Sequence, residues 1–404
     1  MSGKDPKRPS VAPPAPTTGG PASARTPSQA PPPAPPPPPP TDDERWMDVA
    51  LTAAKNGRPS PNPHVGAIVV KNGELVGSAH HERAGTDHAE VAALRAAGDK
   101  AVGSSLYVTL EPCNHHGRTP PCTDAIIAAK VARVVIGVRD PNPHVEGDGA
   151  ERLRAAGIEV VLGVREEKAR TQIAPWAKHI TAGVPYVSLK LALSLDGRIA
   201  TRTGESKWVT GPDARAKVHL LRAKSDGIAV GIGTALADDP RLTVRDAPGD
   251  SPLRIVFDTK LRLPIASRLV QTAREIPTLV LCGLDASHDA EDVLAAQGVE
   301  CLRSPLSAEG RLDVLSALRS LAQRGIVSLM VEGGAELAGS FLAGRFADEL
   351  HVFVAPILLG PRGRAGAVDW AGPDTPQQAP RIATPAWELV GNDAYVHGPL
   401  VYPE

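Results

Sequence analysis

Residues 88–122 read HAEVAALRAAGDKAVGSSLYVTLEPCNHHGRTPPC, and this stretch decides the fold of the first half of the chain. Apolar residues at helical spacing predict a helix over 88–97, which Gly98 ends. The apolar run at 106–110 predicts a buried strand, and a second helix is expected over 123–130. His88, Glu90, Cys113 and Cys122 therefore stand at the ends of these elements, where the side chains of different elements can meet.

These residue types in this order indicate a zinc site. Zinc is held by histidine and cysteine in a tetrahedron, and a catalytic zinc keeps three protein ligands and one open position. His88, Cys113 and Cys122 supply three ligands. Glu90, two residues after His88, can reach a zinc-bound water and carry protons. The pattern H-x-E followed by P-C-x-x-C is the signature of zinc deaminases that act on nucleobases.

The spacing of the cysteines departs from that signature. Eight residues, 114–121, separate Cys113 from Cys122, where the general pattern has two. This insert can form a loop over the metal that meets the substrate, and His115 and His116 can contact substrate, compete as ligands or lie in solvent. The alternatives for the whole cluster are a structural zinc site and coincidence, but a closed structural site has four protein ligands.

Helices and strands alternate on both sides of this stretch, which predicts an α/β protein with a largely parallel sheet after one hairpin. Thr41 or Asp42 caps a helix that runs to about residue 56. The turn Asn72-Gly73 joins two strands. The remaining elements of the first half are expected at 134–138 (strand), 150–156 (helix), 158–162 (strand) and 166–180 (helix).

A Gly/Pro break at 181–185 marks a boundary, after which the alternation resumes. Strands are expected at 186–193, 227–230, 253–258, 278–281, 327–331 and 350–354, a helix at 212–223, and a hairpin at 386–390 and 394–400. No G-x-G-x-x-G motif follows a strand, so the Rossmann fingerprint is absent. The glycines at 231–233 and 333–334 each follow a strand, where they bind phosphate at a helix start or serve as packing turns.

Composition excludes several classes of protein. The chain has 404 residues, a net charge of −1, 42% hydrophobic residues and 4 Cys. The charge argues against a large nucleic-acid-binding face, and the few cysteines exclude a disulfide scaffold. No apolar run reaches membrane length and no secretory signal is seen, so a cytoplasmic enzyme is expected. Of 41 Pro, 16 lie in residues 1–40, which predicts a disordered proline-rich tail over 1–41.

The motifs together resemble those of the bifunctional deaminase–reductases of bacterial riboflavin synthesis, a family that carries the eight-residue cysteine insert. The resemblance covers about residues 42–400. It rests on the motifs PNPHVG (61–66), HAEV (88–91), TLEPCNHHGRTPPC (109–122), DPNP (140–143), SLDGR (194–198), GESKW (204–208), ADDPRLTVR (237–245) and VEGG (331–334).

This resemblance implies a cytidine-deaminase-like three-layer domain over 42–183 and a dihydrofolate-reductase-like α/β domain over 184–404. The substrate would be 2,5-diamino-6-(5-phosphoribosylamino)pyrimidin-4(3H)-one. Zinc-dependent deamination, with Glu90 catalytic, would replace its 2-amino group with oxygen and release ammonia. NADPH would then reduce the ribosyl chain to ribityl. Relatives also suggest a homo-oligomer.

The resemblance further assigns residues of the second domain. It implies that NADPH contacts Ala192, Trp208, Thr234, Asp238, Gly334, Ala335, Glu336, Leu337, Ala338, Gly339 and Ser340. It implies that substrate contacts Ser206, Arg222, Leu242, Arg245 and Glu332, with the two arginines as phosphate partners. Lys190 is a candidate donor that polarises the sugar C1 during hydride transfer, and its alternative is a buried structural pair with Asp196.

Two other interpretations remain at this point. The first keeps a single zinc deaminase of another nucleobase and makes the second half a binding module. The second is a zinc-stabilised scaffold with a proline-rich arm and no catalysis, which the presence of Glu90 disfavours. The single tryptophans Trp46, Trp176 and Trp387 are expected to pack in the core.

Overall fold

A computed structural model describes residues 39–115, 120–143, 149–245, 247–360 and 366–403. Thr41–Glu404 form one compact unit. The predicted tail, up to residue 38, lies outside the described residues. None of the described helices has the length and apolarity that a membrane span requires.

The first part of the chain begins with a capped helix and a hairpin. Helix α1 spans Asp42–Ala53, and of the two predicted caps it is Thr41 that caps the helix, through a capping box with Glu44. A short 3-10 turn, Ala54–Asn56, follows. Strands β1 (Gly66–Lys71) and β2 (Glu74–His80) pair antiparallel across Asn72-Gly73, where both residues have positive φ. Such a turn matches the twist of the two strands.

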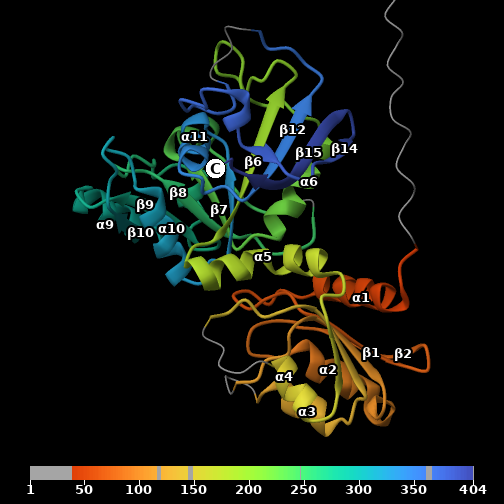
Figure 1. The fold of residues 1–404 in the computed structure, drawn as a ribbon. Coiled ribbons are helices and arrows are strands. Elements are labelled where there is room, and N and C mark those ends of the chain that lie inside the picture. The colour runs from red at the N-terminus through yellow and green to blue at the C-terminus, as the bar shows by residue number, and fades with distance from the viewer. Residues whose placement is uncertain (1–38, 116–119, 144–148, 246, 361–365, 404) are drawn as a thin grey trace, which may run out of the picture. The chain divides into compact units, whose positions relative to one another are not determined.

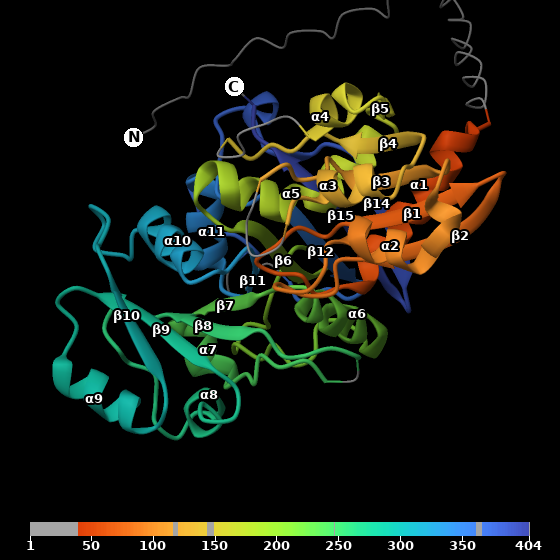
Figure 2. The same ribbon diagram turned by 90° about the horizontal axis from the view of Figure 1, so that it is seen from below.

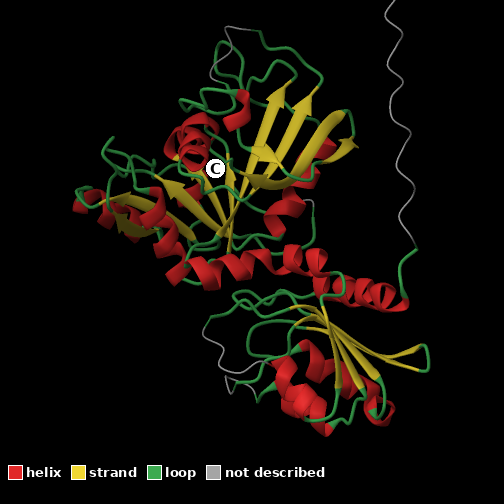
Figure 3. Ribbon diagram, viewed as in Figure 1, coloured by secondary structure: helices red, strands yellow, loops and turns green. Residues whose placement is uncertain are grey.

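A five-stranded sheet in the order β2-β1-β3-β4-β5 organises this part. β1 and β3 are antiparallel, whereas β3, β4 and β5 are mutually parallel, which confirms the predicted sheet. Helices α2, α3 and α4 cover one face, and α1 and α5 cover the other, so the part has three layers (Figures 1 and 3). The other elements are α2 (Ala89–Ala97), a 3-10 turn (Gly98–Ala101), β3 (Ser105–Leu110), α3 (Cys122–Ala128), β4 (Arg133–Val138), α4 (Gly149–Ala155), β5 (Glu159–Leu162) and α5 (Glu166–Ala182).

A ten-stranded sheet organises the second part, with the order β10-β9-β8-β7-β11-β6-β12-β15-β13 and β14 paired to β15. The strands from β10 to β12 run parallel, and β15 turns the sheet antiparallel at its edge. The strands are β6 (Tyr186–Ser194), β7 (Gly227–Gly231), β8 (Leu253–Phe257), β9 (Thr278–Gly283), β10 (Glu300–Ser304), β11 (Ser328–Glu332), β12 (Glu349–Ala355), β13 (Arg381–Ile382), β14 (Ala386–Val390) and β15 (Asp393–Val401).

Helices cover both faces of this sheet, and Figure 2 shows α8 and α9 beside its β8–β10 end. The helices are α6 (Pro212–Ala223), α7 (Ile232–Asp238), α8 (Arg268–Gln271), α9 (His288–Ala296), α10 (Val314–Gln323) and α11 (Ala335–Ala343), with a 3-10 turn at Pro376–Gln378. The sequence analysis missed α7 to α10, β10 and β13. It was also wrong about Trp387, whose 70% exposure follows from its place on β14, an edge strand with an open outer face.

Candidate functional site

The three predicted ligands meet at one point of the first part. His88 is the N-cap residue of α2, Cys113 follows β3, and Cys122 is the first residue of α3. His88 Nδ1 lies 3.2 Å from Cys122 Sγ and 3.5 Å from Cys113 Sγ. A tetrahedral zinc with bonds of about 2.3 Å to sulfur and about 2.05 Å to nitrogen separates such ligand atoms by roughly 3.5 Å. Both nitrogen–sulfur distances are therefore close to those around a zinc ion, and the three ligand atoms lie within 4.8 Å of one another.

Proton sharing within this cluster also matches a metal site. A hydrogen bond with Cys122 lowers the pKa of Cys113 to about 4 and raises the pKa of Cys122. The cluster thus already favours a thiolate, the form of cysteine that binds zinc.

Glu90 lies in the first turn of α2 with its side chain turned inward. The residue is only 4% exposed, and burial raises the pKa of its carboxyl to about 7. A carboxyl whose pKa lies near the working pH can both accept and return a proton. This is the property that a proton carrier beside a metal-bound water requires.

The two ends of the cysteine insert are tied together by polar contacts that the sequence analysis missed. Asn114 Oδ1 accepts hydrogen bonds from Thr123 Oγ1 (2.9 Å) and Arg152 Nη1 (2.5 Å), and Arg152 also pairs with Asp124. These contacts hold Cys113 and Cys122 at their separation.

The first histidine of the insert, His115, lies apart from the three predicted ligands. It is exposed and is not in the cluster of potential metal ligands found among the described residues. The prediction for His116 falls outside the described residues.

Two further buried groups support this centre. Glu111 is 7% exposed and accepts hydrogen bonds from the backbone N–H groups of Asp140 (3.2 Å) and Ala150 (2.9 Å), which joins the segment after β4 to α4. His81 lies edge-on to His88, with ring centroids 5.3 Å apart. Its Nδ1 lies 3.0 Å from the carbonyl oxygen of Asp87, so Nδ1 carries the proton and Nε2 accepts from Asn62 Nδ2 (2.9 Å). The Asn62 of the PNPHVG motif was the only available signal for this contact.

In the second part, a buried charge cluster lies at the carboxyl end of β11, beside the middle of β6. Arg222 on α6 makes two hydrogen bonds to Glu332, at 2.6 and 2.9 Å, and Lys190 Nζ lies 3.9 Å from the same carboxylate. The neighbouring cations hold the pKa of Glu332 at about 2 against the opposing effect of burial. Burial lowers the pKa of Lys190, whose ammonium is thus a more ready proton donor.

The alternative role of Lys190 as a partner of Asp196 is wrong. Asp196 is tied to Ser194 Oγ (2.6 Å) and to the backbone N–H groups of Leu359 and Gly360. The Asp196 side chain is bound within the turn after β6, whereas Lys190 lies directly opposite Glu332 in the register of β6 and the neighbouring strand β11.

Several predicted cofactor residues gather around α7 and the start of α11. Ser206 Oγ donates to Asp238 Oδ1 (2.7 Å), which ties the GESKW segment to α7. Gly333 and Gly334 have positive φ, and a Cβ on Gly334 would lie 3.0 Å from Thr234 Oγ1. The glycines therefore let the end of β11 approach α7 closely and turn the N–H groups of α11 toward that space, an arrangement suited to phosphate.

Within the predicted segment 334–340, side chains differ in their surroundings. Ala335, Leu337 and Ala338 are buried against the core, and Gly339 packs on the backbone of Asp369. Glu336 is exposed and Ser340 is partly exposed. The groups of this segment that a cofactor could contact are thus its first backbone N–H groups and the side chains of Glu336 and Ser340.

The remaining predicted residues surround the same end of the sheet or pack beneath it. Trp208 is 67% exposed beneath the Arg215 guanidinium, 4.6 Å from its ring centroid. Arg245 is exposed and hydrogen-bonds Thr243 Oγ1 (3.0 Å). Leu242 is buried with a positive φ, and Ala192 packs against the α6 core. Arg222, by contrast, has all three of its nitrogens engaged within the protein.

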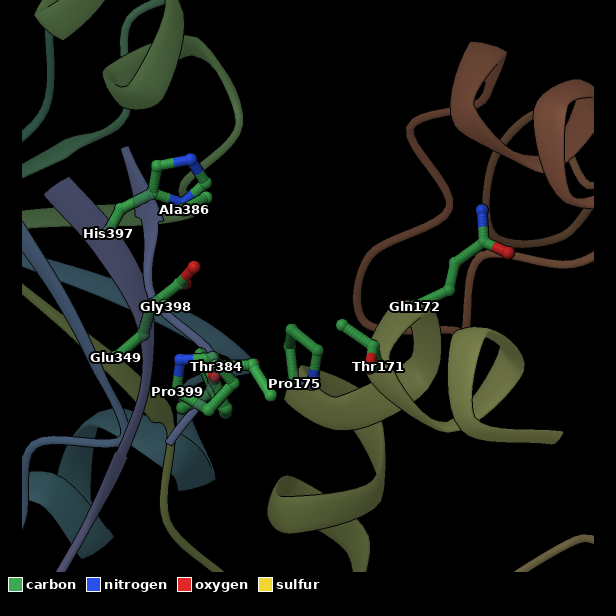
Figure 4. Close-up of a pocket in the computed structure, with 10 residues that line it drawn as sticks. Thr171, Gln172, Pro175, Glu349, Thr384, Ala386, His397, Gly398 and Pro399 are labelled. Atoms are coloured by element: carbon green, nitrogen blue, oxygen red, sulfur yellow. The ribbon is translucent and has the colours of Figure 1, made fainter. Parts of the chain in front are cut away.

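A cavity of about 280 Å³ lies elsewhere, and none of the predicted site residues lines it (Figure 4). It is bounded by α5, through Thr171, Gln172 and Pro175, and by the β12–β15 edge of the second sheet.

Comparison with known proteins decides the family. Residues 40–138 match the family described as "Cytidine and deoxycytidylate deaminase zinc-binding region", and residues 185–396 match "RibD C-terminal domain". The riboflavin biosynthesis protein RibD of Aquifex aeolicus is 46% identical over 321 residues, 79% of this chain and 88% of the relative. The chain belongs to the RibD family. It is a bifunctional enzyme of riboflavin biosynthesis, with a zinc deaminase part and an NADPH-dependent reductase part.

Other RibD proteins extend this similarity. The RibD of Escherichia coli is 43% identical over 372 residues, 88% of this chain and 98% of the relative. The solved structure of Acinetobacter baumannii RibD, form 1, matches with a TM-score of 0.78 at 37% identity, covering 90% of this chain and 99% of that one. The alternative of a single nucleobase deaminase with a binding module is therefore wrong, as is the scaffold without catalysis.

Proposed function

We propose that His88, Cys113 and Cys122 hold the catalytic zinc and that Glu90 is the proton carrier of the deaminase. The single observation that carries this assignment is the approach of His88 Nδ1 to within 3.2 and 3.5 Å of the two sulfurs, beside a buried carboxyl. Zinc with an open coordination position acidifies water and supplies hydroxide near neutral pH. Glu90 takes the proton of the attacking water and returns it to the leaving nitrogen.

The substrate we propose for this site is 2,5-diamino-6-(5-phosphoribosylamino)pyrimidin-4(3H)-one. The water oxygen bonds to C2 of the pyrimidinone, the C2–N bond breaks, and the 2-amino group leaves as ammonia. His81, fixed by Asn62 and Asp87 beside His88, forms part of the wall that orients the ring.

For the reductase, we propose that the space between α7, the GESKW segment and the start of α11 binds NADPH. The glycine turn at 333–334 offers N–H groups to its phosphates, and Trp208, Thr234 and Asp238 line the approach. When bound there, NADPH would supply hydride to the sugar C1. The ribose ring first opens by breaking its C1–O bond, and the resulting carbon–nitrogen double bond at C1 becomes an amine on reduction. Lys190 donates the proton to that nitrogen, and Glu332 holds Lys190 in place.

The arginines divide between two tasks in this proposal. Arg245, which is exposed and donates a hydrogen bond from Nη1 to Thr243 Oγ1, binds the substrate phosphate. Arg222 orients the Glu332 carboxylate through its two hydrogen bonds. The side chains of Ser206 and Leu242 form the rest of the surface that contacts the substrate.

The broader assignments follow the same proposal. We place the division between the two domains at 183/184, where Gly183 ends α5 in a left-handed conformation. A homo-oligomer is supported by the exposed apolar side chains of Trp387 and Leu389 on the edge strand β14. The four free cysteines favour the cytoplasm, and the net charge of −1 argues against nucleic acid as a partner.

A coupled assay tests the proposal. The purified protein is given the diaminopyrimidinone phosphate, and ammonia and NADPH absorbance are followed with and without prior zinc removal. We expect ammonia first, NADPH oxidation after it, and loss of both on chelation. Ammonia without NADPH oxidation would overturn the reductase assignment, and chelator-resistant ammonia release would overturn the zinc assignment.

A further inference from the structure

A second group of metal-binding side chains lies on the antiparallel edge of the second sheet, far along the chain from the cysteines. His351 on β12 and His397 on β15 are direct cross-strand partners. Glu349 stands two residues before His351, so its side chain is on the same face of the sheet. One ligand atom from each of the three lies within 4.8 Å of the others.

The separation of two of these groups matches that of two ligands of one metal ion. His351 Nε2 lies 3.5 Å from Glu349 Oε2. Two atoms bound tetrahedrally to one zinc ion at about 2.1 Å lie about 3.4 Å apart. The His397 ring stacks on that of His351 with centroids 5.7 Å apart, and one of its nitrogens lies within 4.8 Å of the other two ligand atoms.

Neighbouring groups already orient these side chains. His351 Nδ1 lies 2.7 Å from the Tyr395 hydroxyl, which leaves Nε2 directed toward Glu349. Ser188 Oγ donates to the Glu349 carboxylate at 3.2 Å. Metal-binding histidines and carboxylates in proteins have such outer partners, which fix the ring orientation and the tautomer.

The charged groups near these three side chains are compatible with the binding of a cation. Lys217, the cation above the Tyr395 ring, is paired with Glu388 at 2.9 Å. Glu388 also lies 3.7 Å from His397 Nε2, so the charges of Lys217 and Glu388 offset each other beside His397. His351 is buried, whereas Glu349 and His397 line the 280 Å³ cavity of Figure 4.

We propose that Glu349, His351 and His397 form a second metal site, for zinc or a similar divalent transition metal, with its fourth position open to this cavity. Two imidazoles and one carboxylate are the ligand set of an open zinc site, in contrast to the four ligands of a closed structural site. The cavity supplies space for a water molecule or a small anionic ligand on the metal. This site shares no residue with the deaminase centre.

Metal stoichiometry tests the proposal independently of the deaminase. The full chain carrying Cys113→Ser and Cys122→Ser is stripped with a chelator, incubated with a small excess of zinc and passed through a desalting column, and bound zinc is measured by mass spectrometry. We expect one zinc ion per chain, and none when His397→Ala is added. No zinc in the double-serine protein, or one zinc that persists after His397→Ala, would overturn the proposal.

Further variants separate loss of the site from loss of the fold. Glu349→Gln keeps an acceptor for Ser188 and should weaken zinc binding at least tenfold. His288→Ala removes an exposed histidine outside the cluster and should leave one zinc bound. NADPH binding by each variant verifies the fold. Cobalt provides a second readout, because this site lacks thiolate and its cobalt form should show visible bands without the sulfur charge-transfer band.

Discussion

The Arg222–Glu332 pair allows a quantitative prediction about the reductase part. Both side chains are almost fully buried, at 13% and 8% exposure, and two hydrogen bonds join them. Arg222→Met removes the cation and keeps much of the apolar volume. Lys190 Nζ, 3.9 Å away, then remains as a cationic partner of Glu332.

Two separate estimates agree on how much free energy of unfolding the Arg222→Met variant loses. Breaking a buried ion pair by removing one partner costs about 3–5 kcal/mol. Separately, a carboxyl pKa of about 2, compared with 4.5, corresponds to about 3 kcal/mol of stabilisation at neutral pH. For a domain of this size, the melting temperature of the reductase transition should fall by roughly 6–20 °C.

The direction in which this stabilisation changes with pH follows from the pKa of Glu332. The folded pKa of Glu332 is depressed, so its stabilisation is present above pH 4.5 and is lost as the pH falls toward about 2. The difference in stability between wild type and Arg222→Met should therefore narrow over that window. Scanning calorimetry of both proteins from pH 7 down to the limit of solubility measures this effect.

Two controls make the reasoning refutable. Because Glu332→Gln would leave buried Lys190 without its carboxylate partner, the triple variant Arg222→Met/Glu332→Gln/Lys190→Met should recover most of the lost stability, since none of the three buried charges then remains. Arg324→Met breaks the exposed pair with Glu300 and should lower the melting temperature by only a few degrees. A drop for Arg222→Met no larger than that for Arg324→Met would refute the argument.

Three further predictions concern activity. Glu90→Gln should lower ammonia release by about 10²–10⁴-fold while zinc stays bound, since the proton carrier is lost and the ligands are not; unchanged turnover would contradict its role. Cys122→Ser should abolish zinc binding at the deaminase centre and ammonia release, while reduction of the deaminated substrate continues; loss of both activities with an intact fold would contradict separate sites. Arg245→Ala should raise the reductase KM for substrate about 10-fold or more with NADPH affinity unchanged, through loss of a charge-assisted phosphate contact; an equal KM in Arg245→Ala and wild type would remove Arg245 from the site.

The fold of the first part was largely predictable because its signals are local. The capping box at Thr41 and Glu44, the Asn72-Gly73 turn and the apolar runs each act within a few residues. In the second part, α7 and α8 are short, and the apolar positions of β10 are only partly buried, so local patterns were weak there.

The sequence by itself determined which residues form the proposed zinc site, because His88, Cys113 and Cys122 stand at the ends of elements whose order the pattern already indicates. Tertiary structure alone decided which groups face one another across distant strands. Lys190 pairs with Glu332 rather than the nearby Asp196 because β6 and β11 are adjacent in the sheet. The same is true of His351 and His397, whose proximity depends on the β12–β15 register. The register between strands is set by the packing of the whole sheet, so it cannot be predicted from the local spacing of residues in the chain.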